Sequence, residues 1–311
     1  MIVNVLRSIS DLAKIRGPVV LAAGVFDGFH LGHRAVVERA LADANAIGGT
    51  PVVLTFDPHP AAILRPQNAP PLLTSTRHKI RLLGETGVQH ALVLEFSRKF
   101  AAKPPETFIG ELAETCSPLR EICVGEDWAF GKERAGNLAL LRSLGVKFGF
   151  DAVGISAVAV DGRAVSSTVI RAAVEDGALD IAARLLGRDF SVFGTVIEGR
   201  RLGHTLGFPT ANVRPESEQL PPNGVYAVRV ALDGKLHTGI ANIGVRPTIS
   251  DNAAQRLVEV HLFDFSGELY GCDLDVFFLR FIRAEQKFPS LDALRSQIAS
   301  DVTSVRASFG C

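Results

Sequence analysis

Two histidines three residues apart, His30 and His33, are the first side chains in this sequence whose types and spacing could do chemistry. They belong to the glycine-rich run 24–33, which directly follows the apolar segment 18–23. Free N–H groups at a helix start attract phosphate, and glycine lets the backbone approach a ligand closely. Two imidazoles placed there can donate hydrogen bonds to charge that builds on an α-phosphate as pyrophosphate leaves. Local capping or packing by the rings, and a metal site, are the alternatives.

A group of hydroxyls lies further along the chain. Ser166, Ser167 and Thr168 stand at the start of a helical pattern that contains Arg171. Hydroxyls at a helix start, together with one guanidinium, can hold a polyphosphate. The alternative is that these residues only cap the helix.

The C-terminal half carries polar residues of a different kind. Thr210 and Asn212 follow a glycine-rich turn, and Glu259 lies in a strand-like segment. Taken alone, the first two fit an ordinary turn at the start of a strand, and the carboxylate fits an exposed strand residue. Residue types by themselves therefore leave the chemistry of this half open.

The elements that must position these groups change in kind along the chain. Up to about residue 186, strand-like and helix-like segments alternate, which predicts a parallel sheet covered by helices. The expected strands are 18–23, 51–56, 91–96, 120–124 and 151–160. The expected helices are 33–47, 105–115, 137–144, 167–175 and 178–186. A further helix is expected to be capped by Thr74 and to run through Leu83.

After Gly187 the helical pattern gives way to strands. The strand-like segments are 192–197, 224–232, 236–243, 257–263 and 273–281. Asp233-Gly234 lies between two of them and is a strong hairpin signal. Five or six such strands predict an antiparallel barrel, followed by a final helix capped by Ser290. The expected domains are 1–186 and 187–311.

Composition restricts the class of protein. A chain of 311 residues is long for one core, so two domains are the default. Its 33 Lys and Arg balance 33 Asp and Glu, which argues against a general attraction to nucleic acid or anionic membrane. We expect a cytoplasmic protein without a membrane span, because apolar runs are short and no signal-peptide pattern begins the sequence. No disulfide or zinc site is expected, because the cysteines form no Cys-x-x-Cys pair; they are Cys116, Cys123, Cys272 and Cys311.

The N-terminal motifs resemble those of the nucleotidyltransferase superfamily. Residues 30–33, His-Leu-Gly-His, are similar to its His-x-Gly-His signature, and residues 166–171 are similar to its Ser-Ser-Thr-x-Ile-Arg motif. The resemblance implies a Rossmann-like α/β domain that uses ATP, with His30, His33 and Arg171 as catalytic residues. The implied ATP-binding residues are Gly24, Phe26, Asp27, Gly28, His30, Gly32, His33, Ser166, Ser167, Thr168 and Arg171.

Two further segments narrow this resemblance to prokaryotic FAD synthetase. Thr-Phe-Asp-Pro-His-Pro at 55–60 and Val-Gly-Glu-Asp-Trp-Ala-Phe-Gly at 124–131 match flavin-side motifs of that family. Prolines and aromatic rings can form a flat apolar wall for a fused ring system, and ordinary loop packing is the alternative. The implied flavin-binding residues are Pro58, His59, Pro60, Asp127, Trp128 and Phe130, of which Trp128 stands where the family more often has Phe.

The C-terminal motifs resemble riboflavin kinase. Residues 207–212 look like its Pro-Thr-Ala-Asn signature, and 222–226, 239–248 and 258–263 match further segments. The resemblance implies that Thr210 and Asn212 bind Mg²⁺, which prefers oxygen ligands. It also implies that Glu259 takes the proton from the riboflavin 5′-hydroxyl as this attacks the γ-phosphate of ATP. The implied ATP and Mg²⁺ residues are Gly203, Gly207, Pro209, Thr210 and Asn212.

The chain is thus identified as a member of the bifunctional riboflavin kinase/FMN adenylyltransferase family, with a Rossmann-like domain followed by a kinase barrel and a terminal helix. The expected partners are riboflavin, FMN and ATP, with Mg²⁺ in both reactions and without nucleic acid or membrane; oligomerisation stays open. Two departures concern the kinase, because Glu198 replaces the family's usual His and His204 its usual Arg. Because of these departures, one alternative is an enzyme with adenylyltransferase activity alone, whose C-terminal barrel binds flavin in a regulatory role. The other alternative is a non-catalytic flavin or nucleotide sensor.

Overall fold

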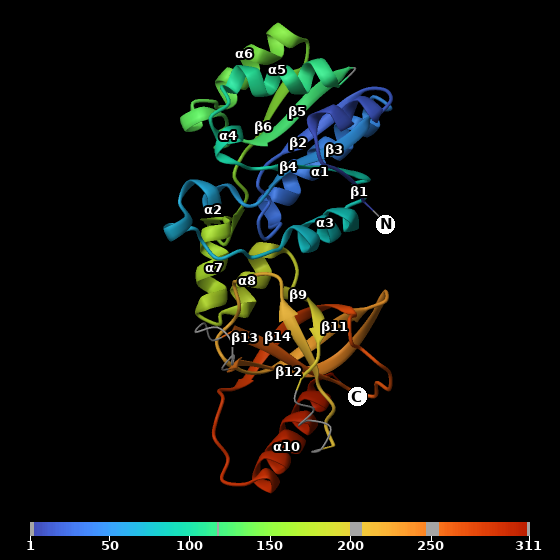
Figure 1. The fold of residues 1–311 in the computed structure, drawn as a ribbon, viewed down its shortest axis with the longest axis vertical. Helices are drawn as coiled ribbons and strands as arrows, with labels where there is room; N and C mark the ends of the chain where they lie inside the picture. The colour runs from blue at the N-terminus through green and yellow to red at the C-terminus, as the bar shows by residue number, and fades with distance from the viewer. Residues whose placement is uncertain (1–2, 117, 200–206, 247–254, 310–311) are drawn as a thin grey trace. The chain divides into compact units, whose positions relative to one another are not determined.

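The computed structural model describes residues 3–116, 118–199, 207–246 and 255–309, which form two compact units (Figure 1). The first comprises Met1–Pro70 and Thr76–Ser167, and the second comprises Pro71–Ser75 and Thr168–Cys311. None of the helices in the described part of the chain combines the length and apolar character that a membrane crossing requires.

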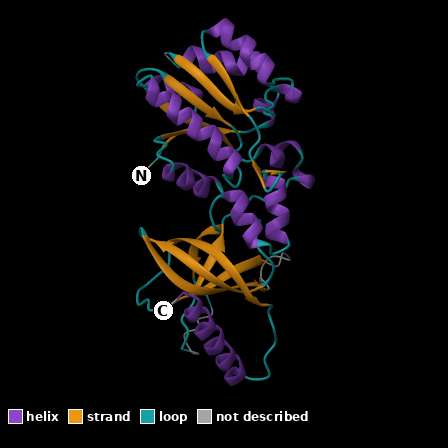
Figure 2. Ribbon diagram, turned by 180° about the vertical axis from the view of Figure 1, so that it is seen from behind, coloured by secondary structure: helices purple, strands orange, loops and turns teal. Residues whose placement is uncertain are grey.

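The first unit is a parallel sheet with helices on its faces (Figure 2). The strand order is β1-β4-β3-β2-β5-β6, with β1 (Asn4–Leu6), β2 (Val19–Ala23), β3 (Thr50–Asp57), β4 (His90–Glu95), β5 (Leu119–Gly125) and β6 (Asp151–Ile155). The helices are α1 (Leu31–Ala46), α2 (Pro60–Leu64), α3 (Thr76–Glu85), α4 (Arg98–Ala101), α5 (Pro105–Thr115) and α6 (Leu138–Phe148). Short 3₁₀ helices span Ile9–Lys14, Pro66–Asn68 and Lys132–Arg134, and β7 (Ala159–Val160) pairs with β8 (Arg163–Ala164).

Alternate residues of the central strand β2 pack on opposite faces of this sheet. Leu21 packs in a cluster with Ile109 of α5, whereas Ala22 packs in another with Val37 of α1. All five residues of β2 are buried, because helices cover both faces. This explains why the sequence shows a continuous apolar run here instead of an alternation.

The second unit is a closed antiparallel barrel with the order β10-β13-β12-β11-β14-β9 (Figure 1). Its strands are β9 (Phe190–Ile197), β10 (Ala211–Pro215), β11 (Gly224–Leu232), β12 (Lys235–Arg246), β13 (Gln255–Leu262) and β14 (Asp273–Arg283). Its helices are α7 (Ser167–Glu175), whose first residue belongs to the first unit, α8 (Leu179–Leu186) and α10 (Leu291–Phe309). Val305 anchors α10 in a cluster with Val225 and Phe263 of the barrel.

The segment Pro71–Ser75, although early in the sequence, belongs with the barrel unit. The Leu72 N–H donates to Glu218 Oε2, and the Gln219 N–H donates to the Leu72 carbonyl, both at 3.0 Å. Ser75 Oγ donates to Glu216 Oε2 at 2.7 Å. These hydrogen bonds fasten the segment to the loop that follows β10, an association that no local pattern in the sequence predicts.

The expected fold class is confirmed in both units, with three corrections of detail. The expected strand 151–160 is divided, because β6 ends at Ile155 and the turn at Asp161 and Gly162, both with positive φ, makes a separate hairpin of β7 and β8. The helix expected from Thr74 begins two residues later, at Thr76. The strands β1 and β10 and the short helices α2 and α4 were not expected.

The division of the chain differs from the sequence estimate. The compact units separate between Ser167 and Thr168, whereas the sequence places the boundary at residues 186 and 187. The latter remains a prediction about how the two activities are divided.

Candidate active sites

The two histidines of the first unit lie side by side at the start of α1. His30 is the residue that caps the helix, and its Nδ1 accepts a hydrogen bond from the His33 N–H at 3.3 Å. The rings are stacked, with centroids 3.6 Å apart and an angle of 16° between their planes. Because Nδ1 of His30 accepts this hydrogen bond, a neutral His30 carries its proton on Nε2. The structure therefore brings both expected histidines to one helix N-terminus.

The loop between β2 and α1 is held in an unusual backbone conformation. Phe26, Gly28 and Phe29 have φ values of 54°, 80° and 38°, and this region is uncommon for residues other than glycine. The two aromatic rings are buried in the core beneath α1, and this burial stabilises the strained backbone. A Cβ on Gly24 would lie 2.9 Å from the Phe26 ring, and one on Gly32 would lie 3.2 Å from the His30 ring. These two glycines thus give room to the ring of a neighbouring residue.

The hydroxyl motif reaches this loop from the start of α7. Ser167 Oγ donates to the carbonyl of Asp27 at 2.9 Å, and Ser166 is half-buried beside it in sequence. Thr168 is exposed, and Arg171 donates from Nε to the Pro71 carbonyl at 2.7 Å within the second unit.

The flavin-side motifs emerge at the same edge of the sheet as the histidine loop. The loops 24–30, 58–59 and 126–131 follow β2, β3 and β5, which are adjacent parallel strands. Ligands of open parallel sheets bind at this edge. The topology therefore joins three motifs that are up to a hundred residues apart in the sequence.

The expected flavin-side residues are not equally accessible. Trp128 and Phe130 stack with centroids 4.4 Å apart at 20°, but Phe130 is buried in the core and Trp128 is half-exposed. Trp128 is thus the ring that a ligand can reach, with Phe130 supporting it. His59 caps α2 by accepting the Ala61 N–H at 3.0 Å. Pro58 and Asp127 are exposed, and Pro60 is half-buried.

One residue beside this site was not expected from the sequence. Lys79 of α3 is only 4% exposed and donates from Nζ to the Val25 carbonyl at 2.7 Å. Burial lowers the pKa of Lys79 to about 8, against the attraction of Asp27 and Asp57. A signal was present, because Lys79 precedes the buried Leu82 and Leu83 by three and four residues and so shares their helix face.

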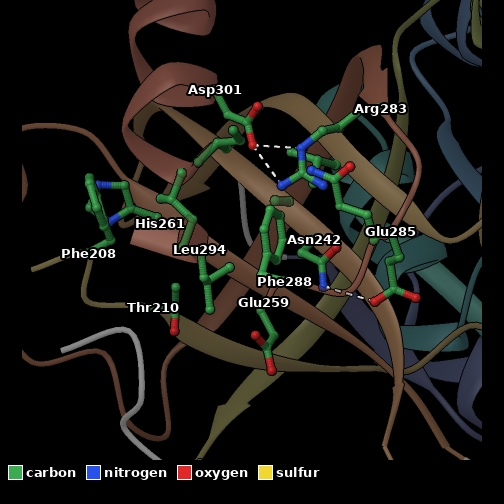
Figure 3. A pocket seen from close by; sticks show the side chains of 15 residues that line it. Phe208, Thr210, Asn242, Glu259, His261, Arg283, Glu285, Phe288, Leu294 and Asp301 are labelled. Carbon is green, nitrogen blue, oxygen red and sulfur yellow. Dashed lines mark hydrogen bonds and ion pairs between the residues drawn. The ribbon is translucent and has the colours of Figure 1, made fainter. Parts of the chain in front are cut away.

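The second unit contains a cavity of about 320 Å³ that two of the expected kinase residues help to line (Figure 3). Thr210 and Glu259 both line it. In the barrel, Glu259 of β13 lies directly opposite Asn212 of β10 on one side and Asn242 of β12 on the other. Residues opposite each other in an antiparallel pair point to the same face. Asn212, Glu259 and Asn242 therefore form a polar row across three strands.

The remaining walls of this cavity combine apolar residues with one ion pair and one amide–carboxylate pair. Arg283 and Asp301 form an ion pair at 2.8 Å, and the Asn242 side chain lies 3.4 Å from Glu285 Oε1 (Figure 3). Both pairs line the cavity. The apolar lining residues are Phe208, Val225, Ile240, Ala241, Phe288, Leu294 and Ile298. The cavity thus offers an apolar wall together with hydroxyl, amide and carboxylate groups.

The other expected kinase residues are only partly described. The Pro209 carbonyl lies 2.8 Å from His261 Nδ1, and Gly207 has φ of 85°, which favours glycine. Gly203 and His204 lie outside the described residues. Sequence reasoning missed Asn242, whose place opposite Glu259 depends on strand register, which the motif itself does not reveal.

Comparison with known proteins agrees with this arrangement. Residues 12–169 match the family model of FAD synthetase, and residues 186–309 match that of riboflavin kinase. Two curated relatives are described as bifunctional riboflavin kinase/FMN adenylyltransferase. The one from Haemophilus influenzae is 38% identical over 98% of this chain and 99% of its own length, and the one from Escherichia coli K12 is 39% identical over 99% and 98%.

A solved structure has the same fold over nearly the whole length of this chain. A crystal structure described as a macrolide-efflux protein from Streptococcus pneumoniae superposes with a TM-score of 0.81 at 28% identity, over 98% of this chain and 99% of that one. The fold and the two family matches thus define a class of two-domain proteins, in which a nucleotidyltransferase-like domain precedes a riboflavin kinase barrel. The chain belongs to the family of bifunctional riboflavin kinase/FMN adenylyltransferases.

Proposed function

We propose that this chain makes FAD from riboflavin in two ATP-dependent steps, each at its own site. The C-terminal part, 187–311, phosphorylates riboflavin to FMN, and the N-terminal part, 1–186, transfers AMP from a second ATP to FMN. The observation that carries the proposal is the full-length similarity, at 38–39% identity, to relatives whose names contain both activities. The stacked histidines at the start of α1 and the row of Asn212, Glu259 and Asn242 in the barrel support it.

The adenylyl-transfer site acts by holding and polarising ATP. An oxygen of the FMN phosphate attacks the α-phosphorus, the bond to the β-phosphate bridge breaks, and pyrophosphate leaves with the electron pair. His30 and His33 donate hydrogen bonds to the charge that develops on the phosphates, aided by the N-terminus of α1. Ser166 and Ser167 hold the β- and γ-phosphates; the same role for Thr168 and Arg171 rests on the sequence resemblance alone. The chain forms no covalent intermediate, since orientation and electrostatics suffice.

The flavin ring of FMN is held by the loops that follow β3 and β5. Trp128 provides the exposed face for stacking, with Phe130 fixed beneath it. Pro58 and Pro60 add apolar surface, and His59 and Asp127 supply polar groups for the ring edges. In this proposal the flavin binds at the edge of the sheet from which the histidine loop also emerges.

The kinase site transfers the γ-phosphate to the riboflavin 5′-hydroxyl. Glu259 accepts the hydroxyl proton as the oxygen attacks the γ-phosphorus, and ADP leaves. The apolar wall around Phe288 and Leu294 suits a fused aromatic ring, and the polar row suits the hydroxylated side chain of riboflavin.

The donor set of the kinase site fits Mg²⁺. Thr210 supplies a hydroxyl and Asn212 an amide oxygen, beside the carboxylate of Glu259, and hard cations prefer such oxygen ligands. When bound there with ATP, Mg²⁺ neutralises phosphate charge. Thr210 and Asn212 hold it, and Gly207 and Pro209 shape the turn that presents them; Gly203 is proposed to contact the phosphates.

The direct test is to incubate the purified chain with riboflavin and Mg-ATP and to separate riboflavin, FMN and FAD by chromatography. We expect FMN to appear first and FAD to follow. FAD formed from added FMN, but no FMN formed from riboflavin, would instead support an adenylyltransferase with a regulatory barrel. Absence of both products would support a flavin sensor.

A further inference from the structure

Lys79 is a buried cation directly beneath the histidine loop. Its Nζ donates to the Val25 carbonyl at 2.7 Å and to Thr55 Oγ1 at 3.3 Å. The Thr55 hydroxyl in turn donates to the same carbonyl at 2.9 Å. Val25 lies in the loop after β2 and Thr55 lies near the end of β3. One side chain of α3 therefore ties the nucleotide motif to the flavin motif.

The carbonyl that these donors share lies at the turning point of the loop. Val25 is followed by Phe26, whose φ of 54° turns the chain into the left-handed region. The loop then runs through Asp27 to His30, which caps α1. A rotation of the Val25–Phe26 peptide would displace the residues that follow it. Two buried donors on one carbonyl oppose that rotation.

Charge gives Lys79 a second effect on the same loop. Asp27, in the loop, is only 3% exposed, and it and Asp57, at the end of β3, are the carboxylates that attract the Lys79 ammonium. A buried carboxylate in a loop that binds a triphosphate opposes the anionic ligand. A cation beside it offsets that repulsion without occupying the ligand site.

We propose that Lys79 is a positioning residue for adenylyl transfer, which fixes the loop carrying His30 and His33 and offsets the charge of Asp27 and Asp57. The inference rests on the function proposed for the first unit. Lys79 is buried and acts through the loop, so it does not touch the substrates.

The main test compares Lys79→Met with wild type in FAD formation from supplied FMN. The Met side chain has similar length and no donor. We expect kcat/KM for adenylyl transfer to fall about 30- to 100-fold, mainly through kcat, because misplaced catalytic groups carry losses of that order. FMN formation from riboflavin by the same protein should not change. Lys147→Met, at an exposed position of α6, is the matched control and should leave both activities at wild-type rates.

Thr55 provides a second test that does not alter charge. Thr55→Val removes the hydroxyl with little change in shape, and Thr55→Ser keeps it. We expect a loss of about 3- to 10-fold for Val, the range of a single hydrogen bond, and near wild-type FAD formation for Ser. This pair decides the inference if Lys79→Met fails to fold, as judged by circular dichroism and thermal unfolding.

A pH profile separates positioning from mere packing. Since the pKa of Lys79 is lowered to about 8, the ammonium loses its proton as pH rises through that value, and the charges of Asp27 and Asp57 are no longer offset. Wild type and Lys147→Met should therefore lose FAD-forming activity between about pH 7 and 9, and Lys79→Met should lack this decline.

The outcomes distinguish the inference from the function on which it rests. A folded Lys79→Met with wild-type kcat/KM refutes the inference alone, as does a Thr55→Val that equals Thr55→Ser. An alkaline decline that persists unchanged in Lys79→Met also refutes it. A wild-type protein that makes no FAD from FMN refutes the proposed function, and the inference falls with it.

Discussion

The two sites of this molecule are built in opposite ways. In the first unit, the polar groups lie on loops at the ends of adjacent parallel strands, and each motif is contiguous in the sequence. In the second, they lie within strands, where barrel register aligns Asn212, Glu259 and Asn242. The first design presents loop backbone and the N-terminus of α1 at the edge of a sheet, whereas the second places side chains in a row across a sheet. The difference predicts that loop and strand substitutions will affect the two activities separately.

The largest separation is expected from Glu259→Gln, which keeps the shape of the side chain but removes the proton acceptor. FMN formation from riboflavin should fall about 10²- to 10⁴-fold, the usual contribution of a general base. FAD formation from supplied FMN should not change, because Glu259 lies in the barrel. Initial rates of both reactions on the same preparation provide the measurement. Loss of both activities in a folded protein would contradict independent sites.

The reverse separation is expected from His33→Ala. Removing one donor from the stacked pair should lower FAD formation about 10²- to 10³-fold, as for other donors to developing charge. FMN formation from riboflavin should continue at the wild-type rate and FMN should accumulate. Chromatography of the products over time tests this, and continued FAD formation at the wild-type rate would exclude His33 from the site.

A smaller effect is expected from Gly199→Ala, which tests the strand-based design without touching a proposed ligand. A Cβ on Gly199 would lie 2.1 Å from Asn212 Nδ2, so the amide must move. We expect an approximately 10-fold loss of FMN formation and a higher Mg²⁺ requirement, since displacement of a positioning group is costly. FAD formation from supplied FMN by the same protein is the internal control and should stay at the wild-type rate. A Gly199→Ala protein with normal Mg²⁺ dependence would show that Asn212 is not a ligand.

The smallest effect concerns the departure at residue 204. If the missing guanidinium weakens phosphate contact, His204→Arg should lower the kinase KM for ATP by about 3- to 10-fold, the scale of one ordinary net hydrogen bond. The KM for ATP in FAD formation should stay constant and serves as the internal control. An unchanged kinase KM would mean that neighbouring groups already replace the Arg.

Much of the first unit could be predicted from sequence because its signals are local. The apolar run before Gly24, the helical spacing after His33 and the helical segment 137–144 each depend on neighbouring residues only, and the structure contains all three elements. Lys79 was missed because a charged residue in a helix is ordinarily assigned to its exposed face. Its burial depends on acceptors from two other elements.

The barrel was predicted as a class but not in its detailed arrangement. Strand periodicity and the Asp233-Gly234 turn indicate antiparallel strands, whereas closure depends on β10 pairing with β9 and β13. The short β10 follows a turn-rich stretch and carries no alternation long enough to recognise. Asn242 was missed for the same reason, since only register places it opposite Glu259.

The segment Pro71–Ser75 has a consequence for how this polypeptide can be cut and how it is made. Because the barrel unit includes residues that precede α3, neither unit is one uninterrupted stretch of chain. A fragment starting at residue 187 would lack the backbone partner of Gln219 and the hydroxyl that meets Glu216. On the ribosome, this segment emerges more than a hundred residues before the first barrel strand, β9. Its hydrogen bonds to Glu216, Glu218 and Gln219 can therefore form only after most of the first unit has been synthesised.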